Sequence, residues 1–131
     1  MLNIRSAGPS DASSWLRLRC ALWPDGASDH PQEIAAFFAG ETNDPSAVFL
    51  AESDGHCIAI LELAFRTDLR RFLEQKVGYI EGLYVEPGHR GKTLTRLLLR
   101  TSQAWARQER CVALASDRAG RVIFDPHYSL D

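Results

Sequence analysis

One segment, residues 79–105 (YIEGLYVEPGHRGKTLTRLLLRTSQAW), constrains the fold more than any other part of the chain. It begins with strand-forming residues at 79–85 and ends in a run whose apolar residues recur at the spacing of a helix. The loop between them, residues 89–93 (HRGKT), is basic. Unpaired N–H groups and the positive end of the helix dipole meet at a helix N-terminus, where they bind phosphate. The segment therefore predicts a strand–loop–helix unit with an anion site at its loop.

The rest of the chain adds strands and helices around this unit. Apolar runs bounded by turn residues predict strands at 3–7, 47–52, 57–65, 111–116 and 121–125. Helical spacing predicts helices at 12–23 and 31–39. The order is β-α-α-β-β-β-α-β-β, with an antiparallel hairpin first and a β-α-β crossover after it. We expect an α+β (mixed α/β) fold, a mostly antiparallel sheet flanked by helices, in a single domain of residues 1–131.

The composition narrows the classes of function. The chain has 15 Lys and Arg against 17 Asp and Glu, a net charge of −2, so we expect no nucleic-acid partner. No apolar run approaches the length of a membrane span, and no basic-then-apolar leader opens the chain. We therefore expect a cytoplasmic protein without membrane contact. Three cysteines lie far apart and form no CxxC pair, so we expect no metal site.

Three segments resemble the GCN5-related N-acetyltransferase superfamily, and within it the aminoglycoside 6′-N-acetyltransferases. Residues 15–24 (WLRLRCALWP) are similar to that branch's W-x-x-L-R-x-x-L-W-P segment, and residues 78–87 (GYIEGLYVEP) are similar to its central strand. Residues 115–117 (ASD) are similar to the end of its fifth strand. The resemblance implies transfer of an acetyl group from acetyl-CoA to a small cationic amine, most simply the 6′-amine of an aminoglycoside antibiotic.

The resemblance also implies how the cofactor binds. In this superfamily the central strand separates from its neighbour, so the backbone of Leu83 and Val85 would pair with the pantetheine arm. The residues implied around the pyrophosphate are Arg90, Gly91, Lys92, Thr93, Leu94 and Thr95.

This loop departs from the family form R/Q-x-x-G-x-G/A, because both small positions are occupied by threonine, Thr93 and Thr95. Glycine allows the closest approach of the backbone to a phosphate, so we expect weaker acetyl-CoA binding than a glycine loop gives. The alternative is that Thr93 simply caps an ordinary surface helix.

Two acidic residues and one aromatic residue are the candidates for the amine site. The resemblance implies that Glu81 and Asp117 bind the amine and receive its proton, and that Trp23 forms a wall against the sugar. Each has an alternative role: Glu81 could form a surface ion pair, Asp117 could lie in a turn, and Trp23 could be buried in the core.

The segment after Asp117 departs most from the family. The run RAG is followed by RVIF (residues 121–124), which resembles the family's terminal strand. No segment matches the helix that the family has between the two, so we expect a fold truncated near the C-terminus. No residue is assigned to protonate the leaving thiolate. A homodimer could cover the side that this helix leaves bare. Two alternative functions stay open: a non-catalytic binding or assembly module, and acetylation of another small amine.

Overall fold

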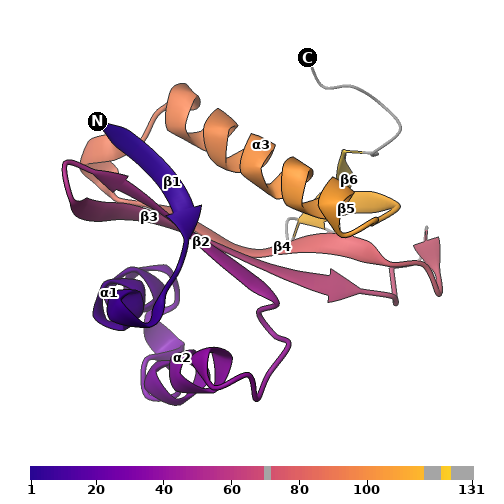
Figure 1. Cartoon of the computed structure of the whole chain (residues 1–131), viewed down its shortest axis with the longest axis horizontal. Coiled ribbons are helices and arrows are strands. Elements are labelled where there is room, and N and C mark those ends of the chain that lie inside the picture. Colours follow the sequence, from indigo (N-terminus) through magenta and orange to yellow (C-terminus); the bar gives the residue numbers. More distant parts are fainter. Residues whose placement is uncertain (70–71, 117–121, 125–131) are drawn as a thin grey trace.

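The computed structural model describes residues 1–69 and 72–116, together with the backbone of residues 122–124. Its strands and helices follow the expected order along the chain (Figure 1). They are β1 (Leu2–Ser6), α1 (Ala12–Leu22), α2 (His30–Phe38), β2 (Ala47–Ser53), β3 (His56–Arg66), β4 (Val77–Val85), α3 (Lys92–Gln108), β5 (Ala113–Ser116) and β6 (Val122–Phe124). Short 3-10 turns precede α1, α2 and α3.

The strands form one sheet in the order β1-β2-β3-β4-β5-β6. Four strands, β1 to β4, are antiparallel neighbours, β4 and β5 are parallel, and β6 returns antiparallel. Helix α3 makes the crossover between the parallel pair and lies on one face, while α1 and α2 cover the other (Figure 1). The predicted mixed, mostly antiparallel fold is confirmed.

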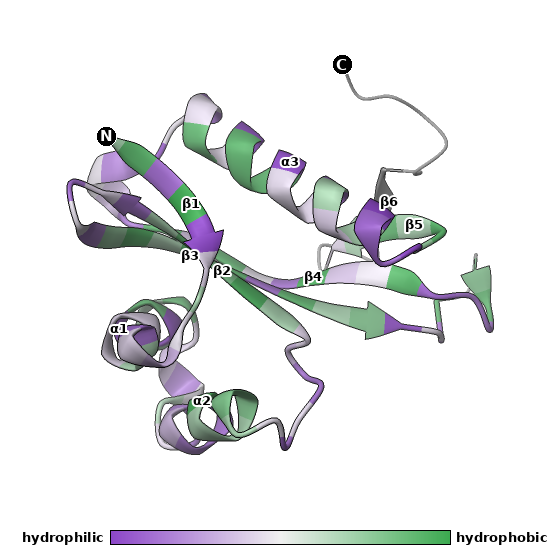
Figure 2. Cartoon of the chain, in the orientation of Figure 1, coloured by the Kyte–Doolittle hydropathy of each residue, from purple (hydrophilic) through white to green (hydrophobic). Residues whose placement is uncertain are grey.

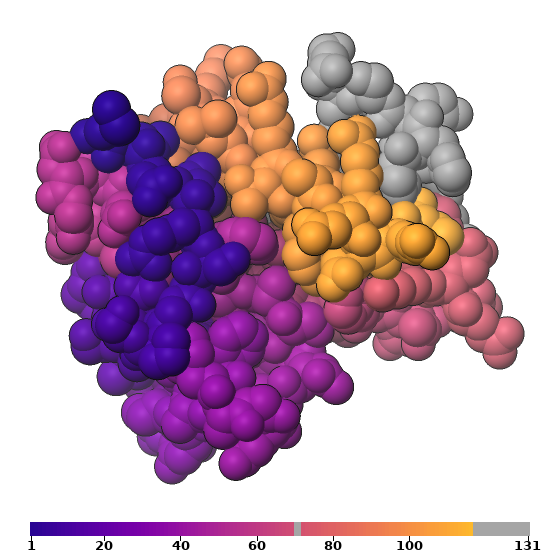
Figure 3. All heavy atoms as spheres, in the orientation of Figure 1, coloured from indigo at the N-terminus to yellow at the C-terminus, as the bar shows by residue number. Residues whose placement is uncertain are grey.

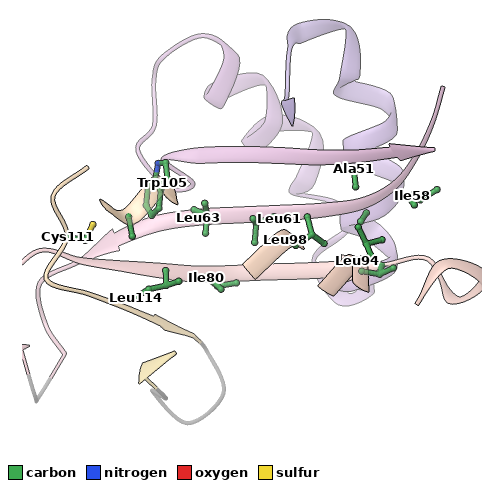
Figure 4. Close-up of a cluster of buried hydrophobic side chains, with 13 residues drawn as sticks. Ala51, Ile58, Leu61, Leu63, Ile80, Leu94, Leu98, Trp105, Cys111 and Leu114 are labelled. Carbon is green, nitrogen blue, oxygen red and sulfur yellow. The ribbon is translucent and has the colours of Figure 1, made fainter. Parts of the chain in front are cut away.

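Two hydrophobic layers hold the helices on the sheet. Under α3, Leu94 and Leu98 pack with Leu61, Leu63 and Ile80 of the central strands (Figure 4). Under α1 and α2, the buried side chains are Trp15, Leu18, Ile34, Val48, Leu50, Cys57 and Ile60. Because helices cover both faces, β3 is hydrophobic along most of its length, whereas α3 alternates hydrophobic and hydrophilic residues (Figure 2). The outer side of α3 lies on the molecular surface (Figure 3).

Strand β4 contains a β-bulge at Glu81. Glu62 of β3 pairs with Gly82, but the next residue, Leu63, pairs with Ile80, so Glu81 has no partner in the register. An extra residue of this kind bends a strand and changes the direction of a side chain, which is why bulges are common beside functional sites.

Strand β4 also extends beyond its parallel neighbour. Its pairing with β5 runs only from Val77 to Ile80, opposite residues 113–116. In the part of the chain that the structure describes, no strand pairs with the remaining five residues of β4 on this edge. Among the described residues, the pairing of β4 with β5 therefore ends at Ile80.

Candidate functional site

The first part of the site is the open N-terminus of α3. Gly91 is the N-cap, with an extended backbone (φ 165°, ψ 170°), and in the part of the chain that the structure describes this end of the helix has no side-chain cap. Thr93 is the second residue of the helix and its side chain is exposed. The alternative in which Thr93 caps the helix is therefore wrong, because the N-cap is Gly91 and the helix begins at Lys92, two residues earlier than a Thr93 cap would require. The first N–H groups of α3 are left facing solvent.

The loop before this helix is uncrowded. A Cβ atom placed on Gly88 or Gly91 would find no other atom within 4 Å. Arg90 and Lys92 are exposed beside it, so the loop is open and positively charged. Both properties suit an anionic group that approaches the helix along its axis.

The second part is the unpaired edge of β4. The N–H of Glu86 donates to the carbonyl of Ile58 at 2.8 Å, which directs the backbone of this residue toward β3. Since backbone groups alternate in direction along an antiparallel strand, those of Leu83 and Val85 face the opposite edge, beyond the end of β5. The carbonyl of Val85 accepts a hydrogen bond from Nε of Arg90 at 2.9 Å. Arg90 thereby connects the end of this edge to the loop.

The third part is an acidic cavity of about 510 Å³. Its lining residues are Asn43, Asp44, Ala64, Phe65, Arg66, Thr67, Asp68 and Glu81. Ala64 lies two residues after Glu62 on β3, so it belongs to the sheet face that carries α1 and α2. Three carboxylates and one guanidinium line the cavity, and this balance favours a cationic ligand.

Glu81 is held in this cavity by Arg66. Nη2 of Arg66 lies 3.0 Å from each carboxylate oxygen of Glu81, and Nε lies 3.2 Å from one of them. The guanidinium carbon is also 4.2 Å from the centre of the Tyr79 ring. Hydrogen bonding to Glu81 raises the pKa of Arg66. Glu81 thus forms the ion pair that was its alternative interpretation, and the same carboxylate lines the cavity.

Trp23 lies directly against β4. A Cβ atom on Gly82 would stand 2.6 Å from Cη2 of Trp23, so the indole fits only because Gly82 has no side chain. The carbonyl of Trp23 is 2.9 Å from Nε2 of His30, and the guanidinium of Arg19 lies 5.4 Å from the indole centre. Trp23 is half-buried and packs against Gly82, the residue after Glu81. It is not among the described residues that line the cavity.

A buried charged cluster is centred on Glu62, the residue of β3 that pairs with Gly82 of β4. Glu62 is 1% exposed, accepts a hydrogen bond from the indole N–H of Trp15 at 2.9 Å and lies 3.3 Å from Nε of Arg19. Arg19 also contacts Glu33 at 3.2 Å. Burial raises the pKa of Glu62, and the contact with Trp15 and the charge of Arg19 only partly oppose this. Sequence reasoning did not identify this cluster, whose members come from α1, α2 and β3.

Several residues of the cavity were also missed. Arg66 and Asp68 belong to a charged stretch of sequence that reads as a solvated connection, and Asn43 and Asp44 come from the loop before β2. The only available signal was the two-residue period of a strand, which places Arg66 on the same side as Ala64. Asp117, the second predicted acid, lies outside the described residues.

Metal and membrane features can be assessed for the described ranges only. Within residues 1–69, 72–116 and 122–124, no group of three or more His, Cys, Asp or Glu is arranged to hold a metal ion. No helix of those ranges has the length and apolar character needed to cross a bilayer.

The chain is similar to known acetyltransferases in sequence and in fold. The sequence model described as the acetyltransferase (GNAT) family matches residues 12–121. An aminoglycoside N(6′)-acetyltransferase type 1 of Klebsiella aerogenes is 36% identical over 116 residues, which are 87% of this chain and 76% of that protein. A crystal structure of an aminoglycoside antibiotic 6′-N-acetyltransferase of Acinetobacter haemolyticus has a TM-score of 0.76 and 36% identity, covering 89% of this chain and 79% of the other.

A second solved structure contains ligands. It is AAC(6′)-Iy in complex with the bisubstrate analogue CoA-S-monomethyl-acetylneamine, with a TM-score of 0.79 and 25% identity. The match covers 89% of this chain and 79% of that protein.

Proposed function

The chain belongs to the acetyltransferase (GNAT) family, and we propose that it transfers the acetyl group of acetyl-CoA to a primary amine, the 6′-amine of an aminoglycoside antibiotic. The observation that carries this proposal is the position of Glu81 on β4. This residue faces an acidic cavity, and the same strand leads to an unpaired edge and then to the open N-terminus of α3.

The described residues fit the cofactor. The uncapped start of α3, with Arg90, Gly91, Lys92, Thr93, Leu94 and Thr95, would hold the pyrophosphate. The backbone groups of Leu83 and Val85 would pair with the pantetheine arm along the edge that β5 leaves unpaired. Val85 lies four positions after Glu81, roughly 13 Å along an extended strand. This length lies between the amine site and the end of the edge that would bind the pantetheine arm. Acetyl-CoA supplies the acetyl group already activated as a thioester.

The chain's own part in the reaction is to hold and deprotonate the amine. The carboxylate of Glu81 would bind the ammonium group by charge-assisted hydrogen bonds and receive its proton, directly or through water. Asp44 and Asp68 would bind further ammonium groups of a polycation, and orientation of the amine would supply much of the rate. Asp117 is proposed as a second acid, and Trp23 as a wall against a sugar ring.

The choice of aminoglycoside rests on similarity and on charge. Relatives that cover most of this chain are named aminoglycoside 6′-N-acetyltransferases, and one neighbour was solved with an analogue that joins CoA to an aminoglycoside. Aminoglycosides are polycations, and the cavity carries three carboxylates. The two threonines in the phosphate loop favour a second candidate, a binding module that has lost strong cofactor affinity.

Two further expectations belong to this proposal. A homodimer is supported by the stretch of β4 that no described strand covers, and light scattering after gel filtration would test it. A cytoplasmic location is supported by the three cysteines, all of them free thiols.

An acetylation assay tests the function directly. The purified chain with acetyl-CoA would be offered kanamycin-type aminoglycosides, linear polyamines and peptides with a free N-terminus. The proposal predicts the highest kcat/KM for the aminoglycosides and a loss of about 100-fold or more in Glu81→Gln. Faster acetylation of polyamines or peptides would support another amine, and no product with any acceptor would support the binding module.

A further inference from the structure

The guanidinium of Arg66 binds the carboxylate of Glu81 in the way that a substrate cation would. We propose that Arg66 is a built-in competitor that a substrate amine must displace, and that it lowers the affinity of every amine, so that an amine needs further contacts in the cavity to bind tightly. This inference rests on the proposed function of the cavity as the amine site.

The contacts of Arg66 are those that a bound cation would make. Its guanidinium donates to both oxygens of Glu81 at 3.0 Å and lies over the Tyr79 ring at 4.2 Å. A carboxylate and an aromatic face together form a common binding site for an ammonium group. An incoming amine and the guanidinium of Arg66 therefore need the same carboxylate oxygens.

Arg66, rather than Glu81, is the partner able to move. It is the last residue of β3, and its side chain is 37% exposed, whereas that of Glu81 is 18% exposed and begins in a bulge of the central strand. An arginine side chain at a strand end has rotamers that carry its head group into water while its stem stays on the surface. The competitor can thus leave without a change in the backbone.

The remaining carboxylates of the cavity determine which amines bind. Among the described residues, neither Asp44 nor Asp68 takes part in an ion pair, and both are exposed. Displacing Arg66 costs the same free energy for every amine, so it weakens the binding of all of them by one factor. Only an amine that also reaches Asp44 and Asp68 recovers this loss. Asp44 and Asp68 therefore set the ratio between the affinities of a polycation and a monoamine, and Arg66 lowers both affinities together.

Isothermal titration without acetyl-CoA tests the competition. Kanamycin A is the polycation, and 6-amino-6-deoxyglucose, one of its rings, is the matched monoamine. Arg66→Met keeps the apolar stem and removes the guanidinium, and we expect it to lower the Kd of both amines by about three- to tenfold. Arg66→Lys keeps the charge but not the forked donor, so a smaller decrease is expected. Lys76→Met is the control for net charge, because Lys76 contacts the Phe65 ring and the Glu109 carbonyl rather than Glu81.

A double-mutant cycle identifies the shared carboxylate. In the background Glu81→Gln, the gain from Arg66→Met should vanish, because there is no longer a carboxylate to compete for. Thermal unfolding of each variant checks that the fold persists. The inference would be overturned if Arg66→Met increased the Kd of either amine, or if Lys76→Met lowered the Kd as much as Arg66→Met does. It would also be overturned if Arg66→Met still lowered the Kd in the Glu81→Gln background, or if no variant bound either amine.

The assay of acetyl transfer separates this inference from the proposed function. If the wild-type chain acetylates kanamycin A but Arg66→Met does not bind amines more tightly, the competitor role of Arg66 is contradicted and the proposed function is not. A gain in amine affinity in a chain that never forms acetylated product supports the competitor and contradicts the proposed reaction.

Discussion

Gly82 and Trp23 fit together only because Gly82 lacks a side chain: a Cβ atom there would stand 2.6 Å from Cη2 of the indole. This contact fixes the end of α1 against β4, one residue after Glu81. The Glu-Gly pair of the central strand therefore combines a carboxylate that faces the cavity with the space that a neighbouring aromatic ring needs.

The first prediction concerns this contact. Gly82→Ala should lower the free energy of unfolding by about 1–3 kcal/mol, because the new methyl group forces Trp23 and Leu22 away from the strand. Chemical denaturation measures the change. Gly88→Ala is the matched control, since its Cβ would meet no atom within 4 Å, and a change within about 0.5 kcal/mol is expected. Equal losses in the two variants would contradict the packing argument.

The second prediction concerns the buried carboxylate of Glu62. Burial raises its pKa in the folded chain above the value of 4.5 expected when unfolded. The unfolded chain then releases this proton first as the pH rises, so the contribution of Glu62 to stability falls between pH 4.5 and its folded pKa. The free energy of unfolding of wild type minus that of Glu62→Gln should decrease with rising pH. An increase would mean that pairing with Arg19 outweighs burial.

The third prediction concerns Asp11, the N-cap residue of α1, and has the opposite sign. Arg5 donates to both of its oxygens, at 2.7 and 2.9 Å, and this lowers the pKa of Asp11 below its ordinary 3.8. Asp11→Asn should cost about 1–3 kcal/mol at neutral pH. This cost should shrink as the pH falls below 3.8, because the unfolded chain takes up the proton first, and it is lost once the pH falls through the lowered pKa of the folded carboxylate. Urea titrations at pH 7 and pH 3 measure it, and an equal cost at both pH values would contradict the ion pair.

The fourth prediction concerns the phosphate loop. Thr93→Gly should lower the Kd for acetyl-CoA several-fold, because the threonine Cβ stands beside the open N–H groups of α3. The substitution should cost at most about 1 kcal/mol of stability, as glycine is a poor helix former. Calorimetric titration with acetyl-CoA measures the affinity, and Thr101→Gly in the middle of α3 is the control. Unchanged affinity in a folded Thr93→Gly variant would show that Thr93 does not limit cofactor binding.

The sequence predicted the elements well because hydrophobic periodicity reports directly which face of each element is buried. The spacing of Leu94 and Leu98 predicted α3, and the apolar run of residues 57–65 between turn residues predicted β3. The contact between Arg66 and Glu81 was not predictable in the same way. It depends on a bulge in the pairing of two strands, and one residue of shift in a register moves a side chain to the other face.

The cap of α3 and the lining of the cavity show the same limit. Both Gly91 and Thr93 are acceptable N-caps by residue type, and only the backbone geometry places the helix start at Lys92. Asp44 enters the cavity from the loop before β2, far from Glu81 in sequence, so no local pattern marks it. The charged residues of the site could be identified in the sequence, but the residues that lie beside them in the fold could not.

The most direct test of the central claim is a titration of the ¹⁵N-labelled chain with acetyl-CoA, followed by NMR of the backbone amides. The largest shifts should fall on Leu83 and Val85 of β4 and on Lys92, Thr93 and Leu94 at the start of α3, at micromolar to submillimolar cofactor. Absence of shifts at millimolar acetyl-CoA, or shifts confined to other parts of the chain, would contradict it.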